Sequence, residues 1–195
     1  MMLFTFVIEG GEPQQKNGVE VDEILILKIG DGDMEAFDQF YRVTERILYA
    51  YILSLTKDHD MTLDIMQDTY IKLISAAHLY KPMGKPLAWL FTIGKNIFYS
   101  KMRKSNKEIK LDAVEISNDK RFSYISEIED RIVLEGVLKL LTEEEREIVM
   151  LYAVSGMKHR EIAEHLGLKL STALSKYHRA IKKLRDYLEG RGLKS

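Results

Sequence analysis

Hydrophobic residues recur at helical spacing along the first half of the chain. From 34 to 56 they follow one another at intervals of three and four residues, and Asp33 stands at the expected N-cap position. The same periodicity returns from 61 to 77, stops at the prolines and glycine of "HLYKPMGKP", and resumes from Leu87 to about Lys104. The pattern therefore predicts three helices. In the second of them the residues expected to face inward are Leu63, Ile65, Met66, Tyr70, Leu73 and Ile74.

A further group of helices is predicted after residue 125. The tetrapeptides "SEIE" at 126–129 and "TEEE" at 142–145 both have the form of a capping box, in which a hydroxyl oxygen accepts from an amide and a glutamate reaches back. From 159 to 184 two helical segments are separated by Gly167, a residue suited to a tight turn. The apolar residues of this pair that are expected to face inward are Ile162, Ala163, Leu166, Leu174, Tyr177, Ile181, Leu184 and Leu188.

Residues 105–125 separate the two groups of helices. They are polar, lack a sustained period and change charge sign midway, which is typical of a linker. The predicted fold is all-α, with two small helical bundles at 20–104 and 126–190 joined by this flexible linker. Residues 1–19 are expected to be disordered or poorly packed.

The composition agrees with a helical globular protein. Hydrophobic residues make up 46% of the chain, charged residues 30%, and there are only three prolines. The absence of cysteine excludes disulfides, thiolate zinc sites and cysteine nucleophiles, and fits a reducing cytoplasmic location. The apolar run in "MMLFTFVIEG" is short and no basic residue precedes it, so neither an export signal nor membrane insertion is expected.

The formal net charge of −1 conceals an alternation along the chain. Residues 1–80 carry a net charge of −8 and residues 81–110 carry +7. Residues 111–155 then carry −6, and residues 156–195 carry +6. The two basic blocks predict two places that meet a polyanion, although solvated helix faces are the alternative for either block alone.

The sequence lacks signals for catalysis or metal binding. The five histidines lie at no metal-ligand spacing, and no glycine loop of the phosphate-binding kind is present. The "DGD" at 31–33 begins like a calcium loop, but Ala36 stands where that loop requires glycine. We therefore expect neither an enzyme nor a bound metal or cofactor.

The second helix of the 159–184 pair has an outward face on which short polar side chains come first and cations follow. A recognition helix has this surface, because its first turns meet base edges in the major groove and its basic end meets phosphate. An amphipathic hairpin with a solvated basic face is the alternative from the residues alone. The residues on this face are Ser171, Thr172, Ser175, Lys176, His178, Arg179, Lys182 and Lys183.

Longer motifs in both halves carry a family resemblance. They are "GDMEAFDQFY", "DIMQDTYIKLI" and "PLAWLFTIGKNIFYSKMRK", followed by "LLTEEEREIVMLYAVSGMKHREIAEHLGLKLSTALSKYHRAIKKLRDYL". In this order and spacing they resemble the bacterial sigma-70 family, and specifically its extracytoplasmic-function (ECF) type. The first three are similar to region two of that family and the last to region four, whose helix-turn-helix reads the minus-thirty-five promoter element. The resemblance covers about 150 of the 195 residues.

An acidic face is predicted on the helix from 61 to 77. Asp64, Gln67 and Asp68 lie at i, i+3 and i+4 and so share one side of the helix, with Tyr70 nearby. Taken alone, this is a solvated acidic surface. The resemblance implies instead that these four residues bind core RNA polymerase at its clamp helices.

The first basic block interleaves aromatic residues with cations, which suits single-stranded DNA because unpaired bases offer their ring faces for stacking. From the residues alone, Trp89, Phe91 and Phe98 are at least as well explained as core. The resemblance implies that the loop 78–86 and Asn96 form a pocket for a flipped base of the minus-ten element. The residues implied in minus-ten contact are Tyr80, Lys81, Lys85, Trp89, Lys95, Asn96, Lys101, Arg103 and Lys104.

The chain departs from the family pattern around its recognition helix. Lys169 stands where the family often has a capping serine, which makes Ser171 the candidate cap. Leu174 and Ile181 stand where the family often has lysine and arginine. Fewer phosphate contacts are implied at these positions. The promoter sequences of other family members are therefore not expected to apply to this chain.

The resemblance implies a protein that binds core RNA polymerase, directs it to specific promoters and assists DNA opening, with an anti-sigma protein as a further partner. Two other functions stay open on the sequence alone. A free-standing helix-turn-helix regulator would bind duplex DNA tightly without polymerase. A protein-interaction adaptor would use its basic faces on an acidic partner and need no DNA.

Overall fold

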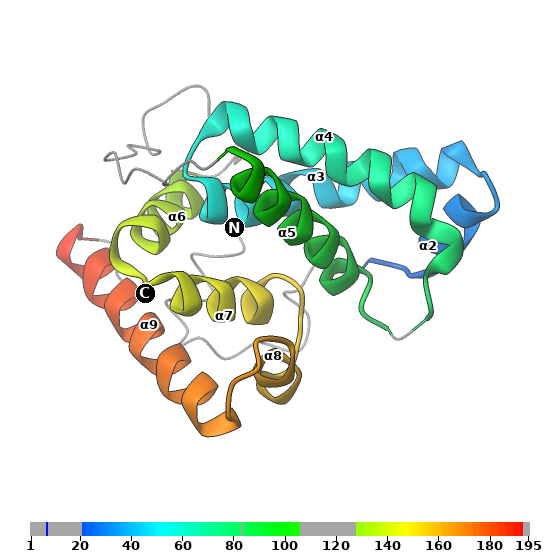
Figure 1. Ribbon diagram of the computed structural model, residues 1–195. Helices are drawn as coiled ribbons and strands as arrows, with labels where there is room; N and C mark the ends of the chain where they lie inside the picture. Colours follow the sequence, from blue (N-terminus) through cyan, green and yellow to red (C-terminus); the bar gives the residue numbers. More distant parts are fainter. Residues whose placement is uncertain (1–6, 8–20, 83, 106–127, 193–195) are drawn as a thin grey trace. The chain divides into compact units, whose positions relative to one another are not determined.

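The computed structural model describes residues 7, 21–82, 84–105 and 128–192 (Figure 1). Every regular element in this part of the chain is a helix, which confirms the all-α prediction. The chain divides into two compact units, one made of Glu20–Leu111 and the other of Met1–Val19 with Asp112–Ser195. The linker expected between the bundles and the capping serine expected at Ser126 lie outside the described residues, as does nearly all of the N-terminal segment.

The first unit contains, in chain order, α2 (Ile24–Gly30), α3 (Met34–Thr56), α4 (His59–Ala76), the short 3₁₀ helix η1 (Ala77–Leu79) and α5 (Pro86–Ser105). The predicted cap of α3 is confirmed, because Oδ1 of Asp33 accepts from the amides of Glu35 and Ala36 at 2.9 and 3.0 Å. The helix α4 begins slightly earlier than predicted, at His59, because Asp58 caps it through a 2.7 Å bond from the Met61 amide.

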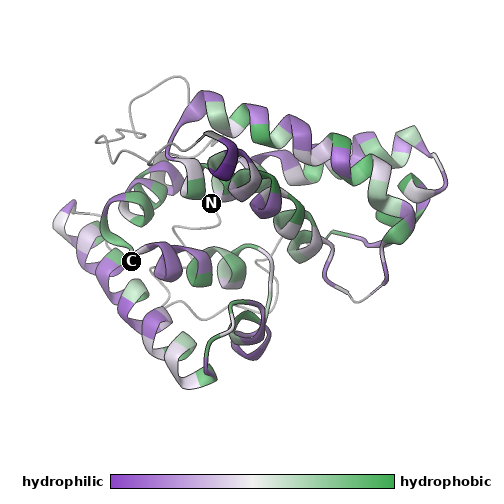
Figure 2. Ribbon diagram, viewed as in Figure 1, coloured by the Kyte–Doolittle hydropathy of each residue, from purple (hydrophilic) through white to green (hydrophobic). Residues whose placement is uncertain are grey.

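The helices α3, α4 and α5 pack against one another around an aromatic and aliphatic core (Figure 1). The rings of Tyr51 on α3 and Phe91 on α5 stack with their centroids 4.1 Å apart. Phe98 is also buried, as the core interpretation of these aromatics predicts. Figure 2 shows hydrophobic and hydrophilic residues sharing each of these helices, which is the pattern of elements buried on one side. The prediction for Ile74 is wrong, because that side chain is 36% exposed on the outer side of α4.

The second unit contains α6 (Ile128–Leu140), α7 (Glu143–Ala153), α8 (His159–His165) and α9 (Leu170–Gly190). The predicted capping box of α7 is confirmed. The Glu145 amide donates to Oγ1 of Thr142 at 3.3 Å, and the Thr142 amide donates to Oε2 of Glu145 at 3.0 Å. Such a cap stabilises a helix by about 1 kcal/mol.

The helix pair α8–α9 turns at Gly167, whose φ of 65° is one that residues with a Cβ seldom adopt. The turn is closed by the Leu168 amide, which donates to the Ala163 carbonyl at 2.8 Å. Leu166 and Leu174, both predicted to face inward, are half-buried, whereas Ala173 is fully buried beside Leu174. The buried residues of α9 are Ala173, Tyr177, Ala180, Ile181, Leu184 and Leu188.

Within the described ranges, no helix has both the length and the apolar character that crossing a membrane requires.

Candidate nucleic-acid interface

The outer face of α9 carries the predicted series of polar and basic side chains. Ser171, Ser175, His178, Arg179 and Lys182 are exposed, whereas Thr172, Lys176 and Lys183 are half-buried. The expectation that Ser171 caps this helix is wrong. The N-cap position is held by Lys169 without a side-chain bond, and Ser171 lies within the first turn. The amides of this first turn are therefore left without a side-chain cap, on the side that a recognition helix presents to DNA.

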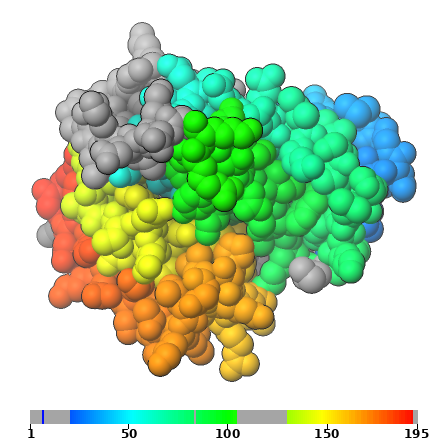
Figure 3. Space-filling model, viewed as in Figure 1, coloured from blue at the N-terminus to red at the C-terminus, as the bar shows by residue number. Residues whose placement is uncertain are grey.

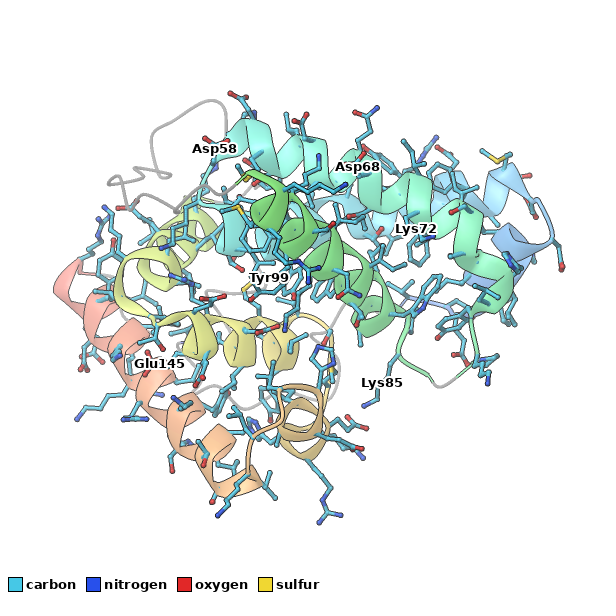
Figure 4. The ribbon with its side chains drawn as sticks, in the orientation of Figure 1. Asp58, Asp68, Lys72, Lys85, Tyr99 and Glu145 are labelled. Carbon is cyan, nitrogen blue, oxygen red and sulfur yellow. The ribbon has the colours of Figure 1, made fainter. Side chains whose placement is uncertain are left out.

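Two of the predicted DNA-binding cations are paired with the acidic first turn of α7. Nζ of Lys176 lies 2.7 Å from Oε2 of Glu144, and Nζ of Lys183 lies 2.8 Å from Oε2 of Glu145. Figure 4 labels Glu145 on α7, on the side of that helix that faces α9. Arg179 and Lys182, by contrast, form no ion pair within the described residues. Both side chains are exposed on the outer face of α9.

The Glu145 carboxylate is buried, with only 5% of its side chain exposed. Burial by itself raises the pKa of this carboxyl, but the hydrogen bonds from Lys183 and from Thr142, together with the Lys183 charge, lower it below its ordinary value of 4.5. Glu145 is thus an ionised group that joins the N-terminus of α7 to the middle of α9.

An aromatic cluster connects α7, α8 and α9. The His159 ring at the start of α8 stacks on Tyr152 of α7, with centroids 4.0 Å apart and planes within 8°. Tyr177 of α9 lies against both rings, at 4.5 Å from His159 and 4.9 Å from Tyr152. This packing holds α9 against α7 and α8.

The C-terminal end of α9 is held by a buried carboxylate of α6. Oε1 of Glu135 accepts from Nζ of Lys139 at 2.7 Å, from Nη2 of Arg191 at 3.1 Å and from the Tyr187 hydroxyl at 3.3 Å. The bond to Glu135 raises the pKa of Lys139, while burial and then the neighbouring Glu135 charge raise the pKa of Tyr187. The helix α9 is therefore anchored at its middle by Glu145 and near its end by Glu135.

The acidic face predicted on α4 is present in part. Asp64 and Gln67 are exposed, and Asp68 is half-exposed and paired with Lys101 of α5, whose Nζ lies 2.7 Å from Oδ2. Figure 4 labels Asp68 on this helix, and Figure 3 shows α4 and α5 together on the visible surface. A residue implied to bind polymerase and one implied to bind DNA are thus in direct contact.

Tyr70 does not lie on this face, so the polymerase contact that the resemblance implied for it is corrected; it lies in the interior, as the apolar period of the helix predicts. Its side chain is only 5% exposed, and its hydroxyl is 2.8 Å from Oγ1 of Thr44. Its ring packs against Tyr41 and Phe37, with centroid distances of 4.8 and 6.0 Å. Tyr70 is two residues from Asp68, and side chains two residues apart on a helix point in different directions. It therefore supports α4 from the interior.

The apolar residue Ile71 is a part of the α4 surface that the sequence reasoning missed. It is 59% exposed and lies three residues beyond Asp68, with the exposed Ile74 a further three residues on. Exposed isoleucines beside Asp64 and Gln67 make a mixed apolar and acidic surface, which suits a protein partner and not a polyanion. The i+3 spacing from Asp68 was a usable signal for Ile71.

The residues predicted to meet the minus-ten element are spread over the η1–α5 loop (described residues 80–82, 84 and 85) and α5. Lys81 is exposed, whereas Tyr80 is only 8% exposed and packs on the half-buried Trp89 with ring centroids 5.0 Å apart. Lys85 is half-buried, and Figure 4 labels it at the start of α5. Tyr80 and Trp89 thus pack together at the two ends of the loop.

The remaining predicted residues follow one another along α5. Asn96 is exposed, and Nζ of Lys95 lies 5.9 Å from the centroid of the Tyr99 ring. Arg103 and Lys104 are exposed in the last turn, where cations also complement the helix dipole. The helix therefore carries its polar and basic groups mainly from Lys95 to its C-terminal end.

Comparison with family models gives two matches. The model described as "Sigma-70 region 2" matches residues 40–108, which include α4, the loop and α5. The model described as "Sigma-70, region 4" matches residues 131–184, which include α8 and all but the last six residues of α9.

Two curated proteins of similar sequence are both described as ECF RNA polymerase sigma factors. The chain is 26% identical over 173 residues to the "ECF RNA polymerase sigma factor SigK" of Mycolicibacterium vanbaalenii, covering 85% of this chain and 88% of that protein. It is 26% identical over 151 residues to the "ECF RNA polymerase sigma factor SigM" of Bacillus subtilis, covering 76% and 92%.

Two solved structures resemble the fold. CnrH in complex with the cytosolic domain of CnrY matches with a TM-score of 0.56 and 26% identity, covering 87% of this chain and 97% of that one. The sigma factor RpoE in complex with the anti-sigma factor NepR from Bartonella quintana matches with a TM-score of 0.58 and 28% identity, covering 78% and 96%.

Proposed function

The chain belongs to the sigma-70 family, in its ECF type, and on that premise we propose that it binds core RNA polymerase, directs it to specific promoters and assists DNA opening. One observation carries this proposal above all. A single chain combines the region 2 and region 4 matches with two chemically different surfaces, an acidic and apolar face on α4 and a basic face on α9.

The face of α4 is assigned to the polymerase. Asp64, Gln67 and Asp68 supply charge and hydrogen-bonding groups, and Ile71 supplies exposed apolar area. Protein interfaces combine such an apolar centre with a polar surround. Tyr70 contributes by holding α4 in place from the interior, through its contacts with Thr44 and Tyr41.

The minus-ten element is assigned to the η1–α5 loop and to α5. Lys81, Lys95, Arg103 and Lys104 are placed to meet backbone phosphates along the strand, and Asn96 offers both a donor and an acceptor to a base. Lys85, Trp89 and Lys101 complete this surface, and the buried Tyr80 supports it from the interior through its packing on Trp89. Extruding a base costs a few kcal/mol, which these contacts offset by capturing the opened strand.

The minus-thirty-five element is assigned to α9. Ser171, Thr172 and Ser175 lie in its first turns and are suited to base edges, while His178, Arg179 and Lys182 follow and are suited to phosphate. Lys176 and Lys183 are shared with Glu144 and Glu145. We assign Lys183 mainly to the fold, since its partner is the buried carboxylate.

The protein is not an enzyme in this proposal, because polymerase carries out the chemistry. It acts in the cytoplasm, where polymerase and DNA are found. An anti-sigma protein is a further partner, supported by the two similar structures, one of which is described as a complex with an anti-sigma factor and the other with a cytosolic domain. Such a partner would cover surfaces needed for polymerase or DNA.

Transcription in vitro tests the proposal. Core RNA polymerase is incubated with genomic DNA fragments, with and without the protein, and the 5′ ends of the transcripts are sequenced. We expect new start sites that share two upstream elements. Start sites that are lost when Arg179 or Lys182 is changed to alanine would place the upstream contact on α9. The Arg42→Ala variant serves as the charge-matched control, because it also removes one cation, which is 75% exposed on α3.

A pull-down of core polymerase in the same samples separates the possible failures. Binding to polymerase without new start sites would mean that the promoters are absent from the fragments. Neither binding nor transcription would overturn the proposal and favour a free-standing regulator, which would then bind duplex DNA alone.

A further inference from the structure

A carboxylate from a distant part of the chain holds the η1–α5 loop. The Tyr80 hydroxyl donates to Oε2 of Glu23 at 3.0 Å, and the Gly84 amide donates to the same oxygen at 2.8 Å. Glu23 precedes these partners by 57 and 61 residues. A single oxygen atom therefore ties together the two ends of the loop.

The side chain of Glu23 bonds to the loop and does not cap its own helix. Glu23 is the N-cap residue of α2 by position, yet its side chain makes no capping bond. Oδ1 of the preceding Asp22 instead accepts from the Ile24 amide at 2.9 Å. The cap of α2 and the support of the loop thus belong to two adjacent carboxylates.

The helix that carries Glu23 rests firmly on the base of the loop. Ile26 and Ile29 of α2 are buried, at 0% and 3% exposure. A Cβ on Gly30 would lie 3.0 Å from the His78 amide nitrogen, so only glycine lets α2 lie this close to the η1 backbone. Glu23 therefore precedes a helix that is packed closely against η1.

The two donors are themselves conformationally restricted. Tyr80 is fixed by its packing on Trp89. Gly84 has a φ of +69°, which a residue with a side chain rarely adopts, and a Cβ there would contact nothing within 4 Å. Backbone conformation and not space is thus the reason for glycine at 84, and this conformation points its amide at Glu23.

We propose that Glu23 is a positioning residue for the η1–α5 loop and that it sets how selectively this loop recognises the minus-ten element. The inference rests on the proposed function. Discrimination between bases requires groups held within about 0.5 Å of the productive geometry, and a loop reaches such precision only when other residues fix it. Glu23 acts through Tyr80 and Gly84, and its removal frees both.

The test measures selectivity of the holoenzyme for single-stranded DNA. The full chain is assembled with core polymerase, and Kd is measured for a non-template oligonucleotide that carries the minus-ten element found in the transcription assay and for a scrambled one. We expect Glu23→Ala to lower the ratio of the two constants at least tenfold. Glu23→Gln should stay within threefold of wild type, because the amide oxygen can accept the same two hydrogen bonds.

Two controls accompany these variants. Glu35→Ala removes an exposed carboxylate elsewhere in the same unit and should leave the ratio within threefold. The affinity for core polymerase should be unchanged in all variants, which distinguishes a displaced loop from an unfolded unit. If Glu23→Ala does not fold, Tyr80→Phe removes one of the two bonds while keeping the buried ring, and a smaller loss of selectivity is expected.

Wild-type selectivity in a folded Glu23→Ala protein, or in Tyr80→Phe if the alanine variant fails, would overturn the inference and leave the proposed function intact. A loss of selectivity in Glu23→Gln as large as that in Glu23→Ala would overturn the inference too. The charge of Glu23, and not its two hydrogen bonds, would then determine selectivity. A wild-type protein that binds polymerase but does not discriminate the oligonucleotides would refute the minus-ten assignment itself.

Discussion

Lys101 of α5 and Asp68 of α4 form an ion pair, with Nζ 2.7 Å from Oδ2. The pair joins the helix assigned to promoter DNA to the helix assigned to polymerase. Both side chains are well exposed, at 40% and 46%, so the pair contributes only about 0–1 kcal/mol to folding. Effects of changing either residue should therefore appear in binding and not in stability.

Asp68→Asn is expected to weaken binding to core polymerase about tenfold, equivalent to about 1.4 kcal/mol, because an interfacial charge is lost. Lys101→Ala should leave that affinity nearly unchanged and weaken binding of single-stranded promoter DNA. Fluorescence titration of labelled protein with core polymerase and with DNA measures both quantities. Asp38→Asn, an exposed aspartate on α3, is the control. Wild-type polymerase affinity in Asp68→Asn would contradict the assignment of this face.

Ile71→Ser should also weaken polymerase binding, because the exposed isoleucine would lose apolar contact area in the complex. Its free energy of unfolding should change by less than about 0.5 kcal/mol, since exposed positions contribute little to the core. Met34→Ser is a matched control, because Met34 and Ile71 are both 59% exposed and only Ile71 lies on the α4 face. Equal polymerase affinities for the two variants would show that Ile71 is not part of the interface.

Lys183→Ala and Lys182→Ala should separate folding from DNA binding. Removing Lys183 leaves the buried Glu145 without its ammonium and should cost about 1–2 kcal/mol, less than for a fully buried pair because Lys183 is 41% exposed. Removing Lys182 should leave stability unchanged and lower the slope of log K against log salt concentration by about 0.9, the value for one phosphate contact. Urea unfolding of both variants measures the change in stability. Titrations of duplex DNA binding at several salt concentrations measure the slope. A salt slope that falls only in Lys183→Ala would reverse the two assignments.

The low pKa of Glu145 predicts acid sensitivity of the α6–α9 unit. A carboxyl whose pKa is lower in the folded state contributes stability above its ordinary value of 4.5, and this contribution is lost as pH falls through the lowered pKa. Glu145→Gln should therefore be less stable than wild type at neutral pH and equally stable at strongly acidic pH, since glutamine can keep the capping box. Urea unfolding at several pH values measures the difference. A difference that stays constant with pH would exclude the Glu145–Lys183 pair as its source.

The sequence determined those features that depend on residues close together in the chain. The caps at Asp33 and Thr142 and the turn at Gly167 need partners no more than five residues away. The helical periods follow from the spacing of apolar residues, and they were sufficient for the all-α fold and for the polar outer face of α9. The motifs that resemble the two family regions lie in these same helical segments.

Only the tertiary structure decided which residues at the edge of each apolar stripe are buried and which are exposed. Ile74 and Leu174 fit the apolar period but lie at the edge of the buried stripe, because adjacent residues on a helix differ by about 100° in direction and packing selects between them. The interior position of Tyr70, by contrast, is the one that the apolar period predicts, and it contradicts only the polymerase contact that the resemblance implied. The pairs Lys183–Glu145 and Tyr80–Glu23 join residues 38 and 57 positions apart, and no periodicity in the sequence can specify such contacts. They arise when helices dock, because burial of apolar faces brings these polar groups within hydrogen-bonding distance and makes leaving them unpaired costly.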